Sequence, residues 1–101
     1  MAYVIETTTT KPEGVQWFNV AYPEIYKEIY DIYQAHKEEH GILATTLKLI
    51  DSNTVVQKQI FLNEESSNSW NVFKTSLVPH QTRYQYNIEN NINYTTQTYN
   101  V

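Results

Sequence analysis

The chain has 101 residues, which is the size of one domain and leaves no room for a second core. Hydrophobic residues make up 41% of it and charged residues 18%, with only 2 Gly and 3 Pro, so we expect a folded domain without low-complexity segments. The absence of cysteine excludes disulfides, thiol nucleophiles and thiolate metal sites, and a net charge of −4 argues against a nucleic-acid partner.

The N-terminal segment predicts a strand followed by a turn. Residues 2–10 (AYVIETTTT) are dense in β-branched and aromatic side chains, which favour strands. The next four residues, KPEG, combine a proline with a glycine and are typical of a turn. We therefore expect Gly14 to adopt a positive φ.

The segment from Asn19 or Pro23 to His40 predicts the first helix. At about 100° per residue, its apolar and ring-bearing side chains share one stripe and its charged side chains lie opposite. The stripe comprises Tyr22, Ile25, Tyr26, Ile29, Tyr30, Ile32, Tyr33, His36 and His40. Pro23 suits the first turn of a helix, and Gly41 suits the position just past its end.

Two alternating runs, residues 44–51 and 54–62, predict an antiparallel hairpin around Ser52-Asn53. Both runs carry apolar side chains on both faces. One face has Leu47, Leu49, Val55 and Phe61, and the other has Ile50, Val56, Ile60 and Leu62. Because helices can cover only one of these faces, we expect a second layer on the other.

A second helix is predicted to begin after Asn63, since two acidic residues follow this capping type and suit the positive end of a helix dipole. Its stripe comprises Trp70, Phe73, Leu77, His80 and Tyr84. Pro79 has no N–H to donate, so we expect the helix to break near Leu77. Residues 92–101 are again β-branched and aromatic and predict a fourth strand.

The resulting order, β-α-β-β-α-β, predicts a single α+β domain over residues 1–101 with a ferredoxin-like fold. In this fold a four-stranded antiparallel sheet has its helices on one face. A second copy of the chain can cover the opposite face, so we expect a homodimer.

With this order, the chain resembles the dimeric α/β-barrel superfamily, which includes antibiotic-biosynthesis monooxygenase-like proteins and cofactor-free or haem-degrading oxygenases. The resemblance spans nearly the whole chain. It rests on the element order, the strand-KPEG-helix opening and the stretch FLNEESSNSWNVFKTSLVPHQTRY. It implies a dimeric α/β barrel and a monooxygenase-like protein with a pocket for a small apolar or aromatic molecule.

The resemblance also implies where this ligand pocket lies. Haem-degrading members carry a Trp and a His ten positions apart on the second helix and an Asn on the first strand. Trp70 and His80 have that separation, but Thr7 stands in place of the Asn, and a hydroxyl cannot present the same N–H. Haem binding or degradation is therefore the weaker expectation, and no cofactor is expected. The implied pocket residues are Thr7, Trp70, Phe73, His80 and Tyr84.

A different role for the same stripe stays open. Aromatic residues at helical spacing also arise when a helix simply buries them in the core. In that case Trp70, Phe73 and Leu77 are core residues of a non-catalytic binding or structural protein of the same fold. The sequence leaves open whether the protein is an enzyme.

His36 and His40 stand at i and i+4, a spacing that can hold a metal ion. Lys37 occupies the position where the zinc-protease motif needs its glutamate, and the sequence shows no third ligand. We therefore expect no metal, with both rings bordering the apolar stripe near the helix C-terminus.

Several other classes lack support. Gly14 and Gly41 are isolated, so no phosphate-binding loop is present, and residues 54–62 lack the glycine and aromatic pair of RNA-recognition domains. No apolar run is long enough for a membrane span, and the N-terminus lacks a signal-peptide pattern, so we expect a cytoplasmic protein. The bias toward Asn, Tyr, Thr, Ile and Lys suggests a bacterial or phage origin.

Overall fold

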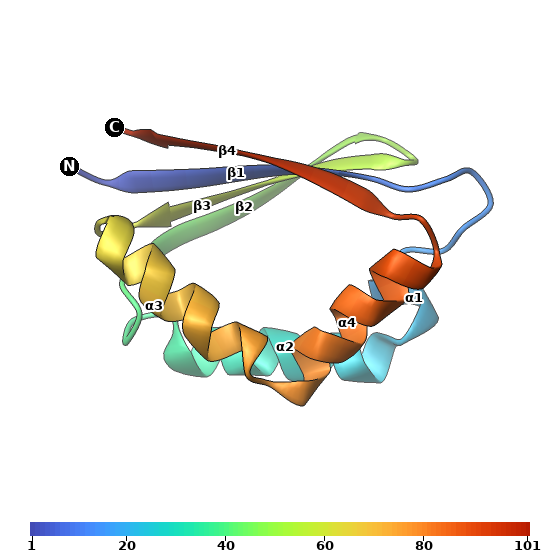
Figure 1. Ribbon diagram of the computed structural model, residues 1–101, viewed down its shortest axis with the longest axis horizontal. Coiled ribbons are helices and arrows are strands. Elements are labelled where there is room, and N and C mark those ends of the chain that lie inside the picture. The colour runs from blue at the N-terminus through green and yellow to red at the C-terminus, as the bar shows by residue number, and fades with distance from the viewer.

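The computed structural model describes residues 1–101 and has two layers, a four-stranded antiparallel sheet and four helices on one of its faces (Figure 1). In chain order the elements are β1 (Tyr3–Thr10), α1 (Phe18–Ala21), α2 (Pro23–His36), β2 (Ile42–Asp51), β3 (Thr54–Phe61), α3 (Glu64–Thr75), α4 (Val78–Glu89) and β4 (Asn93–Asn100). The predicted order and fold are confirmed, with each predicted helix formed by two shorter ones.

The strand order of the sheet is β2-β3-β1-β4, so β1 is a central strand. It pairs along its whole length with β3 on one side and with β4 on the other. Backbone hydrogen bonds of 3.2 and 3.0 Å between Ala2 and Val101 hold the two ends of the chain side by side. The edge strand β2 has irregular pairing near both of its ends.

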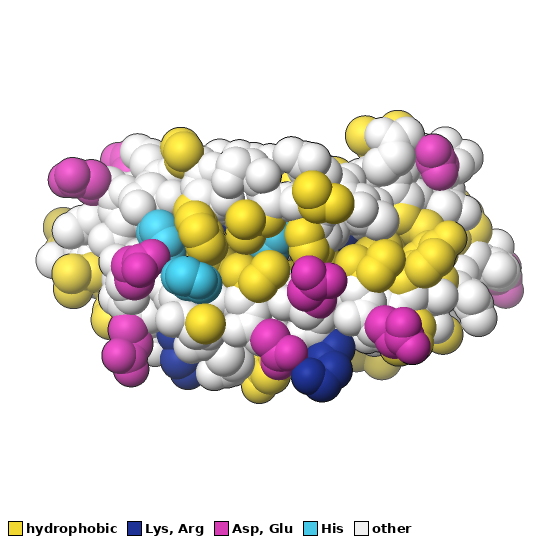
Figure 2. Space-filling model, turned by 90° about the horizontal axis from the view of Figure 1, so that it is seen from below, with side chains coloured by type: hydrophobic (Ala, Val, Ile, Leu, Met, Phe, Trp, Pro, Cys, Tyr) yellow, Lys and Arg dark blue, Asp and Glu magenta, His cyan; other side chains and the backbone are white.

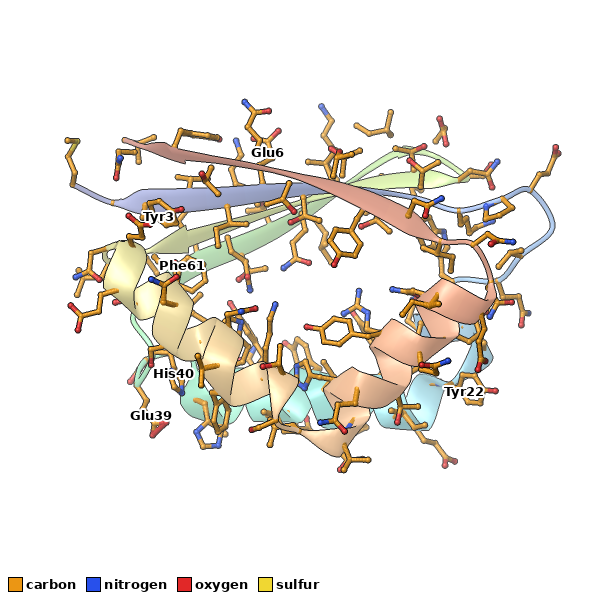
Figure 3. All side chains as sticks on the ribbon, in the orientation of Figure 1. Tyr3, Glu6, Tyr22, Glu39, His40 and Phe61 are labelled. Carbon is orange, nitrogen blue, oxygen red and sulfur yellow. The ribbon has the colours of Figure 1, made fainter.

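The pairing register assigns each strand side chain to one face of the sheet. Tyr3 and Phe61 face one another and point toward the helices, whereas Glu6 points away from them (Figure 3). The helix-facing side therefore also carries Ile5, Thr7, Thr9, Thr45, Leu47, Leu49, Val55, Gln57, Gln59 and Tyr94. Apolar side chains on both faces are confirmed.

The outer face is more polar than the hairpin pattern suggested. Val4, Val56 and Ile60 alternate there with Glu6, Thr8 and Lys58. The Glu6 carboxylate accepts a hydrogen bond of 2.9 Å from the Tyr99 hydroxyl and lies 3.9 Å from the Lys58 ammonium group. Any layer that covers this face must therefore accommodate a charged pair as well as apolar side chains.

The first helical region ends earlier than predicted. α2 begins at Pro23, as expected, but its last residue is His36 and not His40. The chain then passes through turns that end at Gly41, which has a φ of +65°. Glycine adopts this left-handed conformation at lower cost than any other residue, which explains why a glycine ends these turns. Gly14 also has the predicted positive φ, +84°.

The second helical region breaks where the sequence predicts. The Asn63 side chain accepts a hydrogen bond of 2.8 Å from the Ser66 backbone N–H and caps α3. α3 ends at Thr75 and α4 starts at Val78, because Pro79 fits a first helical turn but not a helix interior. α3 and α4 therefore meet at an angle beneath the sheet (Figure 1).

The core lies at one end of the interface between the layers. Ile42, Phe61 and Trp70 are buried together, and Tyr3, Ile5, Tyr33 and Phe73 pack against them. A second aromatic cluster, in which Phe18, Tyr22 and Tyr86 have ring centroids 5.5 to 5.7 Å apart, joins α1 to α4. Seen from the helix side, hydrophobic side chains form a band along the helix layer (Figure 2). No helix has the length and apolar character needed to cross a bilayer.

Candidate functional site

The helix-facing side of the sheet is covered at the core end and open toward the β2–β3 hairpin. Phe61 is fully buried by the helices, whereas Leu47 and Leu49 on the same side are 60% and 65% exposed. Tyr94, which pairs with Thr9 at this end of the sheet, is 63% exposed. Apolar side chains between two layers of one domain are usually buried, so this open end is where a ligand can contact the sheet.

Four side chains from the helices form the interlayer cluster, which consists of Lys74, His80, Arg83 and Tyr84. Lys74 lies in the last turn of α3, and Arg83 and Tyr84 follow His80 on α4 by three and four residues, which places both beside it. The charges of Lys74 and Arg83 both act on the pKa of His80. Neither cation has a carboxylate within ion-pair distance, since the chain's ion pairs are formed by other residues.

His80 is neutral at pH 7. Burial and, to a smaller extent, the positive charges of Lys74 and Arg83 lower its pKa from 6.5 to about 4. The residue is 5% exposed, and its Nδ1 atom is buried without a hydrogen-bond partner. A buried ring nitrogen without a partner is costly, so a group that completed its hydrogen bonding would stabilise the chain.

The other members of the cluster are perturbed in a consistent way. Burial, followed by the charge of Arg83, lowers the pKa of the Lys74 ammonium group. Burial raises the pKa of the Tyr84 hydroxyl, Arg83 opposes this shift and Tyr94 adds to it. The Arg83 guanidinium also lies 6.0 Å from the centre of the Tyr26 ring on α2. The cluster therefore combines two uncompensated cations with neutral hydrogen-bonding groups, an arrangement that favours an anion.

The structure brings together some of the residues predicted from the sequence. His80 and Tyr84 belong to the interlayer cluster, and Trp70 touches it, because its ring lies edge-on to His80 with centroids 6.3 Å apart. Thr7 lies on the helix-facing side of β1. Phe73 instead stacks on His40, with centroids 4.8 Å apart, and faces the end of α2.

The sequence pattern does not identify Lys74 and Arg83 as candidate site residues. Lys74 stands four residues after Trp70, and Arg83 stands three after His80, so both continue the stripe of the second helical region. Charged residues normally lie on the solvent side of such a stripe, which is why the pattern did not single them out.

Haem does not fit the residues present. An axial ligand needs a nitrogen that faces open space, whereas His80 is almost completely buried and its ring abuts Trp70. On the helix-facing side of β1, the Thr7 side chain has a hydroxyl group and no amide N–H to donate. No part of the proposed function therefore involves haem.

A second group of ligand-type side chains lies at the end of α2. His36, Glu39 and His40 place one imidazole nitrogen or carboxylate oxygen each within 4.8 Å of one another. The sequence did not reveal Glu39 as a third ligand, because it lies in the turns after α2 and not on the helical stripe. We call these three residues the α2-end triad.

No protein-family model and no curated protein matches the chain. Solved structures do match. A dimeric ferredoxin-like protein from an uncultured marine organism has a TM-score of 0.75 and 10% identity over 99% of this chain and 94% of that one. SnoaB, a cofactor-independent oxygenase from Streptomyces nogalater, has a TM-score of 0.61 and 12% identity over 99% and 92%.

A candidate antibiotic biosynthesis monooxygenase from Deinococcus radiodurans has a TM-score of 0.60 and 14% identity, covering 97% of this chain and 91% of that one. Such low identities show a common fold and not a common activity. The chain therefore has the ferredoxin-like α+β fold shared by these dimeric and monooxygenase-like proteins, as its sequence predicts.

Proposed function

We propose that the protein binds a small aromatic anion between its helix layer and its sheet. The observation that carries this proposal is the pair of cations in the interlayer cluster, Lys74 and Arg83, neither of which has a carboxylate partner. Cations that are partly withdrawn from water repel one another, and a bound anion relieves that repulsion. A carboxylate or phenolate oxygen is the simplest group that can bind both cations.

The surroundings of the cluster favour an aromatic ring on that anion. Tyr94 presents exposed ring surface from β4, and Tyr84 on α4 is close enough for the two hydroxyl groups to interact. A planar ligand can lie against these side chains while its charged oxygen meets the cations. His80 can donate or accept one further hydrogen bond because it is neutral. Of the predicted pocket residues, Thr7, Trp70, His80 and Tyr84 remain in our proposed pocket, now extended by Lys74 and Arg83, whereas Phe73 packs at the end of α2.

An oxygenase reaction on a phenolic ligand is a second candidate. Neighbouring cations favour the phenolate, which is more electron-rich and easier to oxidise than the phenol. In this candidate reaction the phenol displaces the side chains that cover His80 and donates a hydrogen bond to its unpartnered Nδ1, although a pKa near 4 makes this nitrogen a weak proton acceptor. The fold shared with SnoaB supports this candidate. Oxygen uptake with 1-naphthol that is lost in His80→Gln is the expected result, and no uptake would exclude it.

We also propose a cytoplasmic homodimer formed through the outer face of the sheet. The first matched structure is a dimeric ferredoxin-like protein, and the outer face carries Val56 and Ile60, which are partly exposed in the single chain. A cysteine-free chain suits a reducing compartment.

The binding proposal is tested by calorimetric titration of the full chain with 2-naphthoate and with its neutral analogue 2-naphthamide. We expect 2-naphthoate to bind more tightly, and Lys74→Met to weaken its binding about 10-fold or more, as loss of a hydrogen bond to a charged group requires. Lys27→Met, at an exposed position of α2, is the matched control and should leave binding unchanged. Equal binding of the two compounds, or equal loss in the two variants, would overturn the proposal.

A further inference from the structure

The α2-end triad has the composition and spacing of a metal site. One carboxylate oxygen of Glu39, Oε2, lies 3.2 Å from His36 Nδ1 and 3.2 Å from His40 Nε2. Ligand atoms bound to one tetrahedral zinc ion at about 2.1 Å are separated by roughly 3.4 Å. Both separations are thus close to those of a metal site, and His36, which is partly exposed, can adjust its ring to bring the two imidazoles closer.

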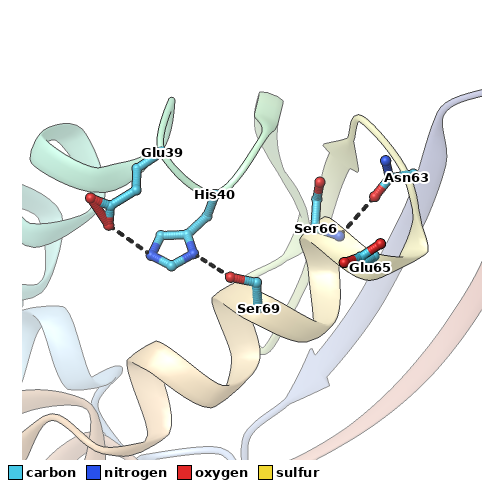
Figure 4. Close-up of a pocket in the computed structure, with 6 residues that line it drawn as sticks. All are labelled: Glu39, His40, Asn63, Glu65, Ser66 and Ser69. Carbon is cyan, nitrogen blue, oxygen red and sulfur yellow. Dashed lines mark hydrogen bonds and ion pairs between the residues drawn. The ribbon is translucent and has the colours of Figure 1, made fainter.

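His40 is held in the orientation that a metal ligand needs. Its Nδ1 atom lies 2.8 Å from the Ser69 hydroxyl oxygen on α3 (Figure 4). Its ring stacks on Phe73. Metal-binding histidines commonly make such a hydrogen bond through the nitrogen that does not bind the ion, which fixes the ring and leaves the other nitrogen free. Here the free nitrogen is Nε2, which points to the Glu39 side.

The free nitrogen lacks a hydrogen bond despite its burial. His40 is 9% exposed, and its Nε2 atom is shielded from solvent without a hydrogen bond of acceptable geometry. When the ring proton sits on Nδ1 and is donated to Ser69, the Nε2 lone pair and the Glu39 carboxylate are two electron-rich atoms 3.2 Å apart. A cation between them removes this repulsion and satisfies both.

Glu39 and His40 of the triad border a pocket with room for further ligands. This hollow of 320 Å³ is lined only by polar and charged side chains, namely Glu39, His40, Asn63, Glu65, Ser66 and Ser69 (Figure 4). A water molecule can fill the fourth position of a tetrahedral ion there. The Glu65 carboxylate adds negative charge on the same side, which favours a cation over an anion.

From these observations we infer that His36, Glu39 and His40 bind a divalent transition-metal ion of the zinc class, with one position open to water. Two imidazoles and one carboxylate are ligands that suit zinc and related ions better than calcium or magnesium. The ion links the end of α2 to α3, because His40 is hydrogen-bonded to Ser69. This site is separate from the interlayer cluster, and the inference does not depend on the proposed ligand there.

The test is titration of the metal-free full chain with Zn²⁺ by calorimetry and with Co²⁺ by visible absorption, where a four-coordinate ion gives intense d–d bands. We expect one ion per chain. Glu39→Gln and His36→Ala should each weaken Zn²⁺ binding at least ~10-fold, since loss of an outer hydrogen bond alone costs 10- to 100-fold. Both side chains are partly or fully exposed, so these variants should keep their fold.

Two further variants make the result decisive. Glu38→Gln changes an exposed carboxylate next to the triad and should leave binding unchanged. Ser69→Ala removes the hydrogen bond to His40 without removing a ligand and should weaken binding by about 10-fold. Absence of binding at 100 µM Zn²⁺ (~10⁻⁴ M), unchanged binding in Glu39→Gln, or an equal loss in Glu38→Gln would overturn the inference.

Discussion

The ring of Trp70 lies edge-on to the ring of His80, with centroids 6.3 Å apart and planes at 87°. Trp70 packs in the core with Ile42 and Phe61, whereas His80 belongs to the interlayer cluster. This contact therefore joins the part of the molecule that maintains the fold to the part that we propose binds a ligand. A change at Trp70 should mainly lower the free energy of unfolding, and a change at His80 should alter how that free energy depends on pH.

Trp70→Ala should lower the free energy of unfolding by about 3–5 kcal/mol, because the indole is 3% exposed and its removal leaves a cavity. Urea denaturation followed by circular dichroism measures this change. Val72→Ala on the same helix is the control, since Val72 is 71% exposed and should change stability by less than ~0.5 kcal/mol. A similar small change for Trp70→Ala would show that Trp70 is not a core residue.

His80 should make the folded state less stable in acid. Its pKa is about 4 in the folded chain and 6.5 in the unfolded chain, so the unfolded chain binds the extra proton first as the pH falls. Stability should decrease between pH 6.5 and pH 4, by an amount on the order of 3 kcal/mol from this residue.

Denaturation in urea at pH 7 and pH 4 tests this dependence against His80→Gln, which has no proton to gain. The variant should lose less stability than the natural chain over this interval. An equal loss in both proteins would mean that His80 titrates normally in the folded state.

Gly41→Ala should destabilise the chain more than Gly14→Ala. Both glycines have a positive φ, which costs an alanine roughly 1 kcal/mol. At Gly41 an added Cβ would also lie 2.7 Å from the Ser66 hydroxyl, whereas at Gly14 it would meet open space. Melting temperatures of the two variants measure the difference. Equal temperatures would contradict the close packing of Gly41 against α3.

The dimer is tested by light scattering during gel filtration at micromolar concentration. We expect a mass of two chains for the natural protein. Val56→Glu, on the outer face of the sheet, should shift it toward one chain because a buried, unpaired carboxylate is costly. Val72→Glu, on an exposed position of α3, should not. A mass of one chain for the natural protein would refute the dimer.

The fold was largely predictable because local patterns and global topology agree. Pro79 marks the break between α3 and α4, because proline has no N–H to donate inside a helix. Gly41 marks the return from α2 to the sheet, because glycine tolerates a positive φ. The end of α2 was placed four residues too late, because His40 fits the stripe of the helix although it lies in the turns beyond it.

The site was less predictable, because its members are set by tertiary structure. The stripe of the second helical region identified His80 and Tyr84, but the charges of Lys74 and Arg83 suggested solvent exposure. Glu39 joins His36 and His40 only through the turn geometry after α2, which no helical spacing describes. The exposure of Leu47 and Leu49 on the helix-facing side depends on where the helices leave the sheet uncovered.

The most direct test of the central claim is a crystal structure of the protein with 2-naphthoate bound. The account predicts that the carboxylate lies within hydrogen-bond distance of the Lys74 ammonium or the Arg83 guanidinium, with the ring against Tyr84 and Tyr94. A naphthoate bound elsewhere, or Lys74 and Arg83 left without the anion at saturating ligand, would contradict it.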